Sequence, residues 1–180
     1  ATGAVVFSST FEEVGVLPIF HPNGRDLLYM DRNRLQIRNL ESGELVAESP
    51  ARFRACKLAF SDDGQMLAIA SLHFPVEVVD SRDWTPRATF PELPRATSVV
   101  WQPRSKAAVF GFEDGRIARI SLEQTPRIEF LDTRGRGAID QLSISADAAL
   151  VASCDSNRRM EVHSVSTGEM LTRATGCPIR

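Results

Sequence analysis

The chain has 180 residues, with 21 Lys and Arg against 23 Asp and Glu, a formal net charge of −2 and 43% apolar residues. This is the composition of an ordinary globular domain, and it lacks the basic excess that binding to nucleic acid or to anionic membranes requires. No apolar run is long enough for a membrane span or a secretory signal, so we expect a cytoplasmic protein without membrane contact.

The three cysteines, Cys56, Cys154 and Cys177, are odd in number and widely spaced. Their spacing fits neither a disulfide framework nor a zinc site, which again favours a reducing compartment. We interpret Cys56 and Cys154, which lie in apolar stretches, as small buried apolar residues.

The first predicted element is a short strand at residues 4–8, which read AVVFS. After it, one pattern occurs four times: an apolar strand, a polar turn, a second apolar strand, a tight turn and a third strand. The first strands end at Phe20, Phe60, Trp101 and Ile144, so the copies lie 40, 41 and 43 residues apart. This period is typical of a unit of four short antiparallel strands, and no stretch has sustained helical periodicity. The sequence therefore predicts an all-β chain.

Residues 1–15 are assigned to the outer strand of a preceding repeat and a loop. We place the four repeats at residues 16–48, 55–90, 96–130 and 139–175. Fourth strands are predicted near residues 4–8, 45–48, 86–90, 126–130 and 170–174. Since only four sets of the other three strands exist, one outer strand is left over.

Turn signals separate the predicted strands. Asn23-Gly24 and Asp63-Gly64 lie between first and second strands, and Asp114-Gly115 lies between a second and a third strand. The Asp114-Gly115 pair predicts a tight hairpin with positive φ at both central residues. The third strand at residues 35–38 alternates apolar and polar residues, so we expect its polar side chains to reach solvent.

The segment FSDDGQMLAIAS at residues 60–71 resembles the tryptophan-aspartate (WD) repeat family, as do LESGE at 40–44 and VSTGE at 165–169. The resemblance covers nearly the whole chain. The signature Trp-Asp positions hold other dipeptides, namely Arg38-Asn39, Val79-Asp80, Ile120-Ser121 and His163-Ser164. The Gly-His dipeptide that opens family repeats is missing. The resemblance implies a β-propeller with four blades, each a four-stranded antiparallel sheet, whose stiffness comes mainly from apolar packing.

Rings of this family usually have seven or eight blades, and four blades leave three alternatives open. The chain is part of a larger propeller, two copies close a ring of about eight blades, or the four blades close a small ring by themselves. An open arc would leave two apolar sheet faces in water, so association or a missing remainder is expected.

We find no nucleophile elbow, phosphate-binding glycine loop, zinc-protease motif or EF-hand spacing. Asp62-Asp63-Gly64 lacks the further ligands of a calcium loop, and a turn explains it. His21, His73 and His163 are interpreted as polar residues at turns or strand ends. The sequence therefore suggests no catalytic, cofactor-binding or metal-ligating residue, and no small-molecule substrate.

In the family that the chain resembles, partners usually bind the loops between the fourth strand and the next blade, and those between second and third strands. Arginine suits such a surface because its planar guanidinium binds carboxylates and stacks on aromatic rings. These loops carry seven arginines and eight acids, so the face is mixed in charge. The candidate partner-binding residues are Arg52, Phe53, Arg54, His73, Phe74, Arg95, Arg134, Arg136 and Arg158.

The resulting expectation is a noncatalytic scaffold for protein–protein interaction, or a sensor or regulatory module that presents its loops to a protein partner. The alternative is a propeller-fold enzyme of hydrolase or lyase type with a site in the central channel. The innermost strands are mostly apolar, with Ser143 and Lys57 among the few exceptions, which argues against the enzyme.

Overall fold

The computed structural model describes residues 18–31, 33–50, 56–133 and 137–176, and no helix occurs among them. Accordingly, no helix in these ranges is long and apolar enough to cross a membrane. The strand predicted at residues 4–8 and Cys177 lie outside the described residues. The described strands form four separate four-stranded sheets, which confirms the predicted all-β class.

Each sheet is antiparallel and takes its strands in chain order, so every strand pairs with its neighbour in the sequence. The first sheet contains β1 (Ile19–Phe20), β2 (Asp26–Asp31), β3 (Arg34–Asn39) and β4 (Leu45–Glu48). The second contains β5 (Cys56–Phe60), β6 (Met66–Ser71), β7 (Val76–Asp80) and β8 (Pro86–Phe90). The third contains β9 (Ala96–Trp101), β10 (Ala107–Phe112), β11 (Ile117–Ser121) and β12 (Arg127–Phe130). The fourth contains β13 (Ile139–Ile144), β14 (Leu150–Asp155), β15 (Arg159–Ser164) and β16 (Met170–Thr175).

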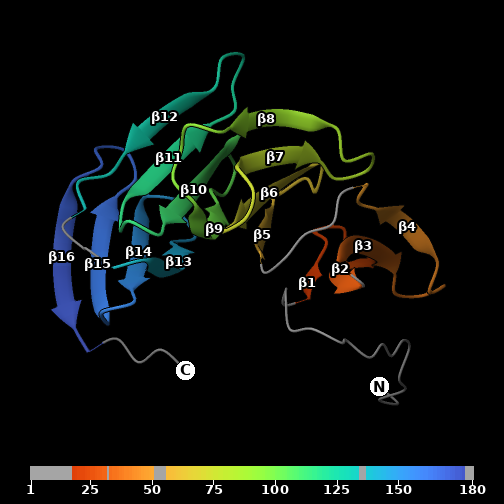
Figure 1. Cartoon of the computed structure of the whole chain (residues 1–180), viewed down its shortest axis with the longest axis horizontal. Helices are drawn as coiled ribbons and strands as arrows, with labels where there is room; N and C mark the ends of the chain where they lie inside the picture. Colours follow the sequence, from red (N-terminus) through yellow and green to blue (C-terminus); the bar gives the residue numbers. More distant parts are fainter. Residues whose placement is uncertain (1–17, 32, 51–55, 134–136, 177–180) are drawn as a thin grey trace.

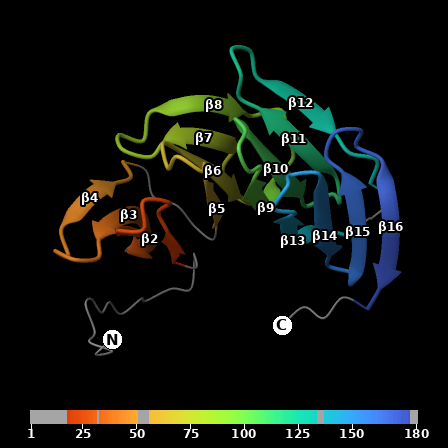
Figure 2. The ribbon, with the colours of Figure 1, turned by 180° about the vertical axis from the view of Figure 1, so that it is seen from behind.

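The four sheets stand side by side around an arc (Figures 1 and 2). The first strand of each sheet lies on the inner side of the arc, and the fourth strand lies on the outer side. The arc is open between the first and the fourth sheet. Because this is how sheets are arranged around a propeller, we call the sheets blades 1 to 4.

The second strand of each blade shows how neighbouring blades pack. Its side chains alternate between the two faces of the sheet. In blade 2, Leu67 and Ile69 belong to the apolar cluster shared with blade 1, whereas Ala68 and Ala70 belong to the cluster shared with blade 3. All four side chains are at most 1% exposed. The strand is therefore apolar on both faces because its sheet lies between two others.

The residue that ends the first strand faces the preceding blade. Phe60 packs against the cluster between blades 1 and 2, and Ile144 packs against the cluster between blades 3 and 4. Trp101 belongs to the cluster between blades 2 and 3 and is 6% exposed. Phe20 occupies the same position in blade 1 but is 70% exposed. No other described blade lies on that side of blade 1.

Polar side chains are also buried within this framework. His163 is fully buried, with its Nε2 at 3.2 Å from the carbonyl oxygen of Asp132 and 3.7 Å from a carboxylate oxygen of Glu161. His163 is therefore an interior residue between blades 3 and 4. The sequence interpretation placed it correctly at a strand end but did not predict its burial.

Gln36 is likewise buried, at 6% exposure. Its amide accepts a hydrogen bond from the Tyr29 hydroxyl at 2.9 Å and donates one to Glu48 at 2.7 Å. The expectation that the polar residues of this strand reach solvent is wrong for Gln36, because neighbouring strands satisfy its hydrogen bonds.

The predicted turn glycines adopt the left-handed conformation, with φ of 69° at Gly24 and Gly64 and 85° at Gly115. Asp114 does not, so the expectation of positive φ at both central residues is wrong there. The physical reason is that the loop has three residues and not two, since the N–H of Phe112 donates to the carbonyl of Arg116. A three-residue hairpin loop needs only one residue in the left-handed conformation, which here is Gly115.

Ala148 occupies the place of Gly24 and Gly64 in blade 4, and its φ is 63°. This conformation costs a residue with a Cβ roughly 1–2 kcal/mol. We therefore expect Ala148→Gly to raise the free energy of unfolding by about 1 kcal/mol. The control Ala149→Gly, at the next position and outside the left-handed region, should lower it by about 0.5–1 kcal/mol. Chemical denaturation measures both, and an Ala148→Gly variant no more stable than the wild type would contradict the assigned strain.

Candidate functional site

The connections of the four blades gather at two opposite rims of the arc, because successive strands run in opposite directions. We call the first rim the turn rim; it holds the turns between first and second and between third and fourth strands. The second, which we call the loop rim, holds the connections between second and third strands and the links between blades. Those of the predicted partner-binding residues that the structure describes lie on the loop rim.

Five of the nine predicted partner-binding residues lie outside the described residues: Arg52, Phe53, Arg54, Arg134 and Arg136. The other four are placed and exposed. His73 and Phe74 lie between β6 and β7, Arg95 lies directly before β9, and Arg158 lies in the turn between β14 and β15. No hydrogen bond or ion pair within the described ranges joins these four side chains to one another. They are therefore distributed along blades 2, 3 and 4.

Blade 3 adds an arginine–aromatic pair to the loop rim that the sequence did not single out. The Arg116 guanidinium lies 5.0 Å from the centroid of the Phe130 ring, and its Nε donates a hydrogen bond to Asp114 at 2.7 Å. Phe130 is 47% exposed. The N–H of Glu113 donates to the carbonyl of Arg95 at 3.0 Å, so Arg95 lies beside the same turn. Exposed cation–π pairs and arginines are typical of protein interfaces.

The sequence placed both residues of this pair on loops or strand ends but did not bring them together. Arg116 follows the Asp114-Gly115 turn and Phe130 ends a fourth strand, and their contact depends on how β11 pairs with β12. A pairing register between β11 and β12 would have been needed to find it.

The turn rim instead joins blades to one another. His21 Nε2 lies 3.1 Å from the carbonyl oxygen of Gly64, which connects the first turns of blades 1 and 2. The main-chain N–H of Arg104 in blade 3 donates to Asp62 in blade 2 at 2.5 Å. The Arg104 guanidinium donates to the carbonyl of Ala146 in blade 4 at 3.0 Å. One rim is therefore cross-linked by hydrogen bonds through all four blades.

A groove lies on the turn rim between blades 2 and 3, with a cavity of about 460 Å³. Asp63, Asp80 and Arg87 line it from blade 2, and Lys106 and Leu122 line it from blade 3. Its size is that of a small-ligand or peptide-side-chain pocket. The sequence could not reveal this groove because turns from two different repeats form it.

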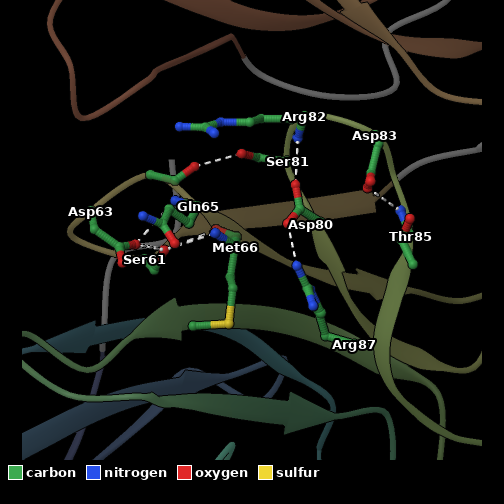
Figure 3. A network of polar contacts seen from close by, with 11 residues as sticks. Ser61, Asp63, Gln65, Met66, Asp80, Ser81, Arg82, Asp83, Thr85 and Arg87 are labelled. Carbon is green, nitrogen blue, oxygen red and sulfur yellow. Dashed lines mark hydrogen bonds and ion pairs between the residues drawn. The ribbon is translucent and has the colours of Figure 1, made fainter.

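Hydrogen bonds hold the acidic groups of this groove in place (Figure 3). Asp63 accepts a hydrogen bond from the Ser61 hydroxyl at 2.6 Å, which is the main reason that its pKa lies below the usual value. Arg87 lies 2.6 Å from Asp80 and lowers the pKa of that carboxyl. Both carboxylates are charged at neutral pH. The groove therefore offers fixed charges of both signs, which suit a polar peptide rather than an apolar ligand.

Charged groups also approach one another near the innermost strands. Burial raises the pKa of Asp140 on β13, the charge of Asp155 adds to the rise, and the charge of Lys57 on β5 opposes it. Asp155 is 2% exposed. Within the described ranges, no group of three or more His, Cys, Asp or Glu side chains is placed to hold a metal ion.

No family model matches the chain, and no curated protein matches it. Solved structures do match. One is described as dihydro-heme d1 dehydrogenase NirN in complex with DHE, with a TM-score of 0.72 and 21% identity over 87% of this chain and 36% of that chain. Another is the β-propeller domain of Myceliophteria thermophila Cps50 (Swd1), with a TM-score of 0.76 and 12% identity over 88% of this chain and 54% of that chain.

Identities this low establish the fold alone. The chain has the fold of part of a β-propeller, and it spans 36% of the first of these structures and 54% of the second.

The hydrogen bonds to Asp63 make a pH-dependent prediction. Because its folded pKa lies below the usual 3.8, the carboxylate stabilises the fold above that pH and stops doing so as the pH falls through the lower value. We expect Asp63→Asn to lower the free energy of unfolding by roughly 0.5–1 kcal/mol at neutral pH, with a difference that vanishes in acid. Urea denaturation across pH measures it. Glu123→Gln removes a charge from the same groove as a control, and a pH-independent deficit in Asp63→Asn would contradict this assignment.

Proposed function

We propose that the chain is a WD-repeat-like propeller segment that serves as a noncatalytic protein-interaction module, with the loop rim as its partner-binding surface. The observation that carries this proposal is the exposed Arg116–Phe130 pair beside Arg95 on that rim. A sensor or regulatory role would use the same surface.

The side chains exposed on the loop rim support this assignment. Hydrogen bonds between blades occur on the turn rim, at His21 and Arg104, and also at the loop-rim ends of the first strands, where Thr97 and Ser98 donate to the carbonyl of Ile139. The loop rim presents exposed side chains, including Phe74 at 38% exposure and Phe130 at 47%. Binding residues are commonly carried by loops that a rigid scaffold positions, and the packed blades provide such a scaffold.

The partner that fits this rim is a protein surface of mixed charge with acidic groups for the arginines. Arg95 and Arg158 are exposed, and Arg116 already stacks on an aromatic ring while binding Asp114. A guanidinium in this arrangement keeps N–H groups that can bind a carboxylate. Cps50 (Swd1) is a propeller neighbour of the same general shape.

An enzyme with a site in the central channel is the second candidate. One observation favours it, namely that Asp140 lies near enough to Lys57 and Asp155 for their charges to shift its pKa. The name of NirN also describes a propeller neighbour as a dehydrogenase. Stoichiometric metal or chromophore in the purified protein would favour this candidate. We expect neither.

Replacing loop-rim residues should abolish partner binding without unfolding the chain. In the test variant, His73, Phe74, Arg95 and Arg158 are all changed to Ala. We expect most of the proteins that cross-link to the wild type in its own cells to be lost, because arginine and aromatic anchors contribute much of an interface's binding energy. Quantitative mass spectrometry of the cross-linked products measures the change.

A matched variant carries the control for this experiment. It changes Arg82, Gln124, Thr125 and Arg127 on the turn rim to Ala. Like the test variant, it therefore loses two arginine charges. We expect its cross-linked proteins to remain. If both variants retain them, His73, Phe74, Arg95 and Arg158 are not the residues that bind the partner. A second loop-rim variant changes Arg52, Phe53, Arg54, Arg134 and Arg136 to Ala and tests the remaining predicted residues.

A further inference from the structure

A groove runs along the turn rim between blades 2 and 3 over two adjoining cavities. The first, of about 460 Å³, and the second, of about 340 Å³, share the lining residues Asp63, Met66, Lys106 and Glu123. We call the two cavities together the turn-rim groove. Its walls come from internal blades, since blade 2 lies between blades 1 and 3, and blade 3 lies between blades 2 and 4 (Figure 1).

The floor of the turn-rim groove is apolar. Met66 of blade 2 and Leu122 of blade 3 line it. Both side chains pack against the apolar cluster between these blades, but they are only partly buried. Their outer surfaces are therefore open to the aliphatic part of a ligand. Such a floor suits a long side chain that can bury an aliphatic stem and keep its charged end in a polar environment.

The cations that line the groove differ in whether they are already bound. Arg87 forms its ion pair with Asp80 at 2.6 Å, and the Arg104 guanidinium donates to a carbonyl of blade 4. By contrast, the exposed Lys106 ammonium makes no hydrogen bond or ion pair with any described residue. Among the described lining residues, Lys106 is therefore the one uncommitted cation.

The carboxylates of the groove keep more of their binding capacity. Asp63 uses a single oxygen, Oδ1, to accept hydrogen bonds from the Ser61 hydroxyl at 2.6 Å and from the N–H of Gln65 at 3.0 Å. Asp62, in the second cavity, accepts from a main-chain N–H of blade 3 with Oδ2 alone. No hydrogen bond from another described residue reaches the second oxygen of either carboxylate.

A further carboxylate, that of Glu123, completes the charge balance of the groove. Glu123 is exposed and makes no hydrogen bond or ion pair within the described part of the chain. The carboxylates of Asp62, Asp63 and Glu123 are therefore available to a ligand, against the single ammonium of Lys106. The free groups of the groove are predominantly acidic, although its lining as a whole carries both signs of charge.

We propose that the turn-rim groove binds an extended peptide segment of a protein partner through a lysine or arginine side chain. The aliphatic stem of that side chain packs on Met66 and Leu122. Its charged end binds the free oxygen of Asp63 together with the carboxylate of Glu123. The chain then has a second binding surface in addition to the loop rim.

Charge complementarity selects a basic side chain over an acidic one. An acidic side chain in the groove would meet Lys106 but would also lie among three carboxylates, and like charges brought together oppose binding. The two adjoining cavities favour an extended segment, because each has about the volume of a site for one side chain or a small ligand.

The turn that holds Asp63 has a counterpart in blade 4, which provides a matched control. There the Ser145 hydroxyl donates to Oδ1 of Asp147 at 2.5 Å, and the N–H of Ala149 donates to the same oxygen at 3.0 Å. Asp147 lines neither cavity of the groove. Asp147→Asn therefore alters the same kind of turn and leaves the groove intact.

Titration followed by nuclear magnetic resonance tests the proposal on the full chain. The probe is the blocked peptide acetyl-Ala-Ala-Lys-Ala-Ala-amide, and two comparison probes carry Glu or norleucine in place of Lys. We expect the lysine probe to shift the methyl resonance of Met66 with a Kd on the order of 1 mM, and to bind more weakly as salt is added. The comparison probes should bind about tenfold more weakly or less.

Substitutions then separate the charges that the proposal uses. Asp63→Asn and Glu123→Gln should each weaken binding of the lysine probe about threefold, because each removes one carboxylate from the site. Lys106→Met should tighten binding about threefold, because it removes the one uncommitted cation. Asp147→Asn should leave the binding unchanged. Circular dichroism establishes that all four variants are folded.

Three outcomes would overturn the proposal. The first is a lysine probe that causes no shift of the Met66 resonance at tens of millimolar, and the second is a glutamate probe that binds as tightly as the lysine probe. The third is lysine binding that neither Asp63→Asn nor Glu123→Gln weakens.

The titration involves no loop-rim residue, so its result is independent of the cross-linking experiment. The turn-rim control variant of that experiment also leaves Asp63, Met66, Lys106 and Glu123 unchanged.

Discussion

The packing of apolar sheet faces against neighbouring sheets is the constraint on which the rest of this structure depends. Each blade has only four short strands and buries no apolar face by itself. Close approach requires small residues at particular positions. A Cβ on Gly111 would lie 2.4 Å from Cγ2 of Ile139, so blades 3 and 4 could not pack as they do with a larger residue there.

This constraint also decides where polar chemistry can occur. Because both faces of blades 2 and 3 are apolar, a polar side chain buried between blades needs a polar partner, as His163 Nε2 has in the carbonyl oxygen of Asp132 at 3.2 Å. Hydrogen bonds between blades occur on the turn rim, as at Arg104, and also at the loop-rim ends of the first strands, where the Ser98 hydroxyl donates to the carbonyl of Ile139. The loop rim in addition exposes arginine and aromatic side chains, among them Arg116 and Phe130.

The fold could be predicted from the sequence because the packing constraint repeats along the chain. Phe20, Phe60, Trp101 and Ile144 recur at one position, and the turn glycines Gly24 and Gly64 mark the same turn in the first two repeats. The candidate site could be predicted from the sequence only as a set of loops. Arg116 and Phe130 meet through strand pairing, and the groove at Asp63 requires two blades side by side.

Trp84 illustrates what local sequence patterns do not reveal. It has φ of 62° at the turn position where blades 1 and 4 have Gly43 and Gly168, both with φ of 73°. A bulky residue is strained in this conformation. Its side chain is nevertheless 6% exposed in the cluster between blades 1 and 2. Packing against the neighbouring blade thus offsets the strain, and only the tertiary structure shows that neighbour.

The central claim, that no blade is stable without its neighbours, can be tested with the two tryptophans. Trp84 lies between blades 1 and 2, and Trp101 lies between blades 2 and 3. In Trp84→Phe and Trp101→Phe variants, the fluorescence of the remaining tryptophan reports one contact, and far-ultraviolet circular dichroism reports the strands. During urea unfolding we expect each tryptophan to become exposed at the same midpoint at which the strand signal is lost. A strand signal that persists after both tryptophans are exposed would contradict the claim.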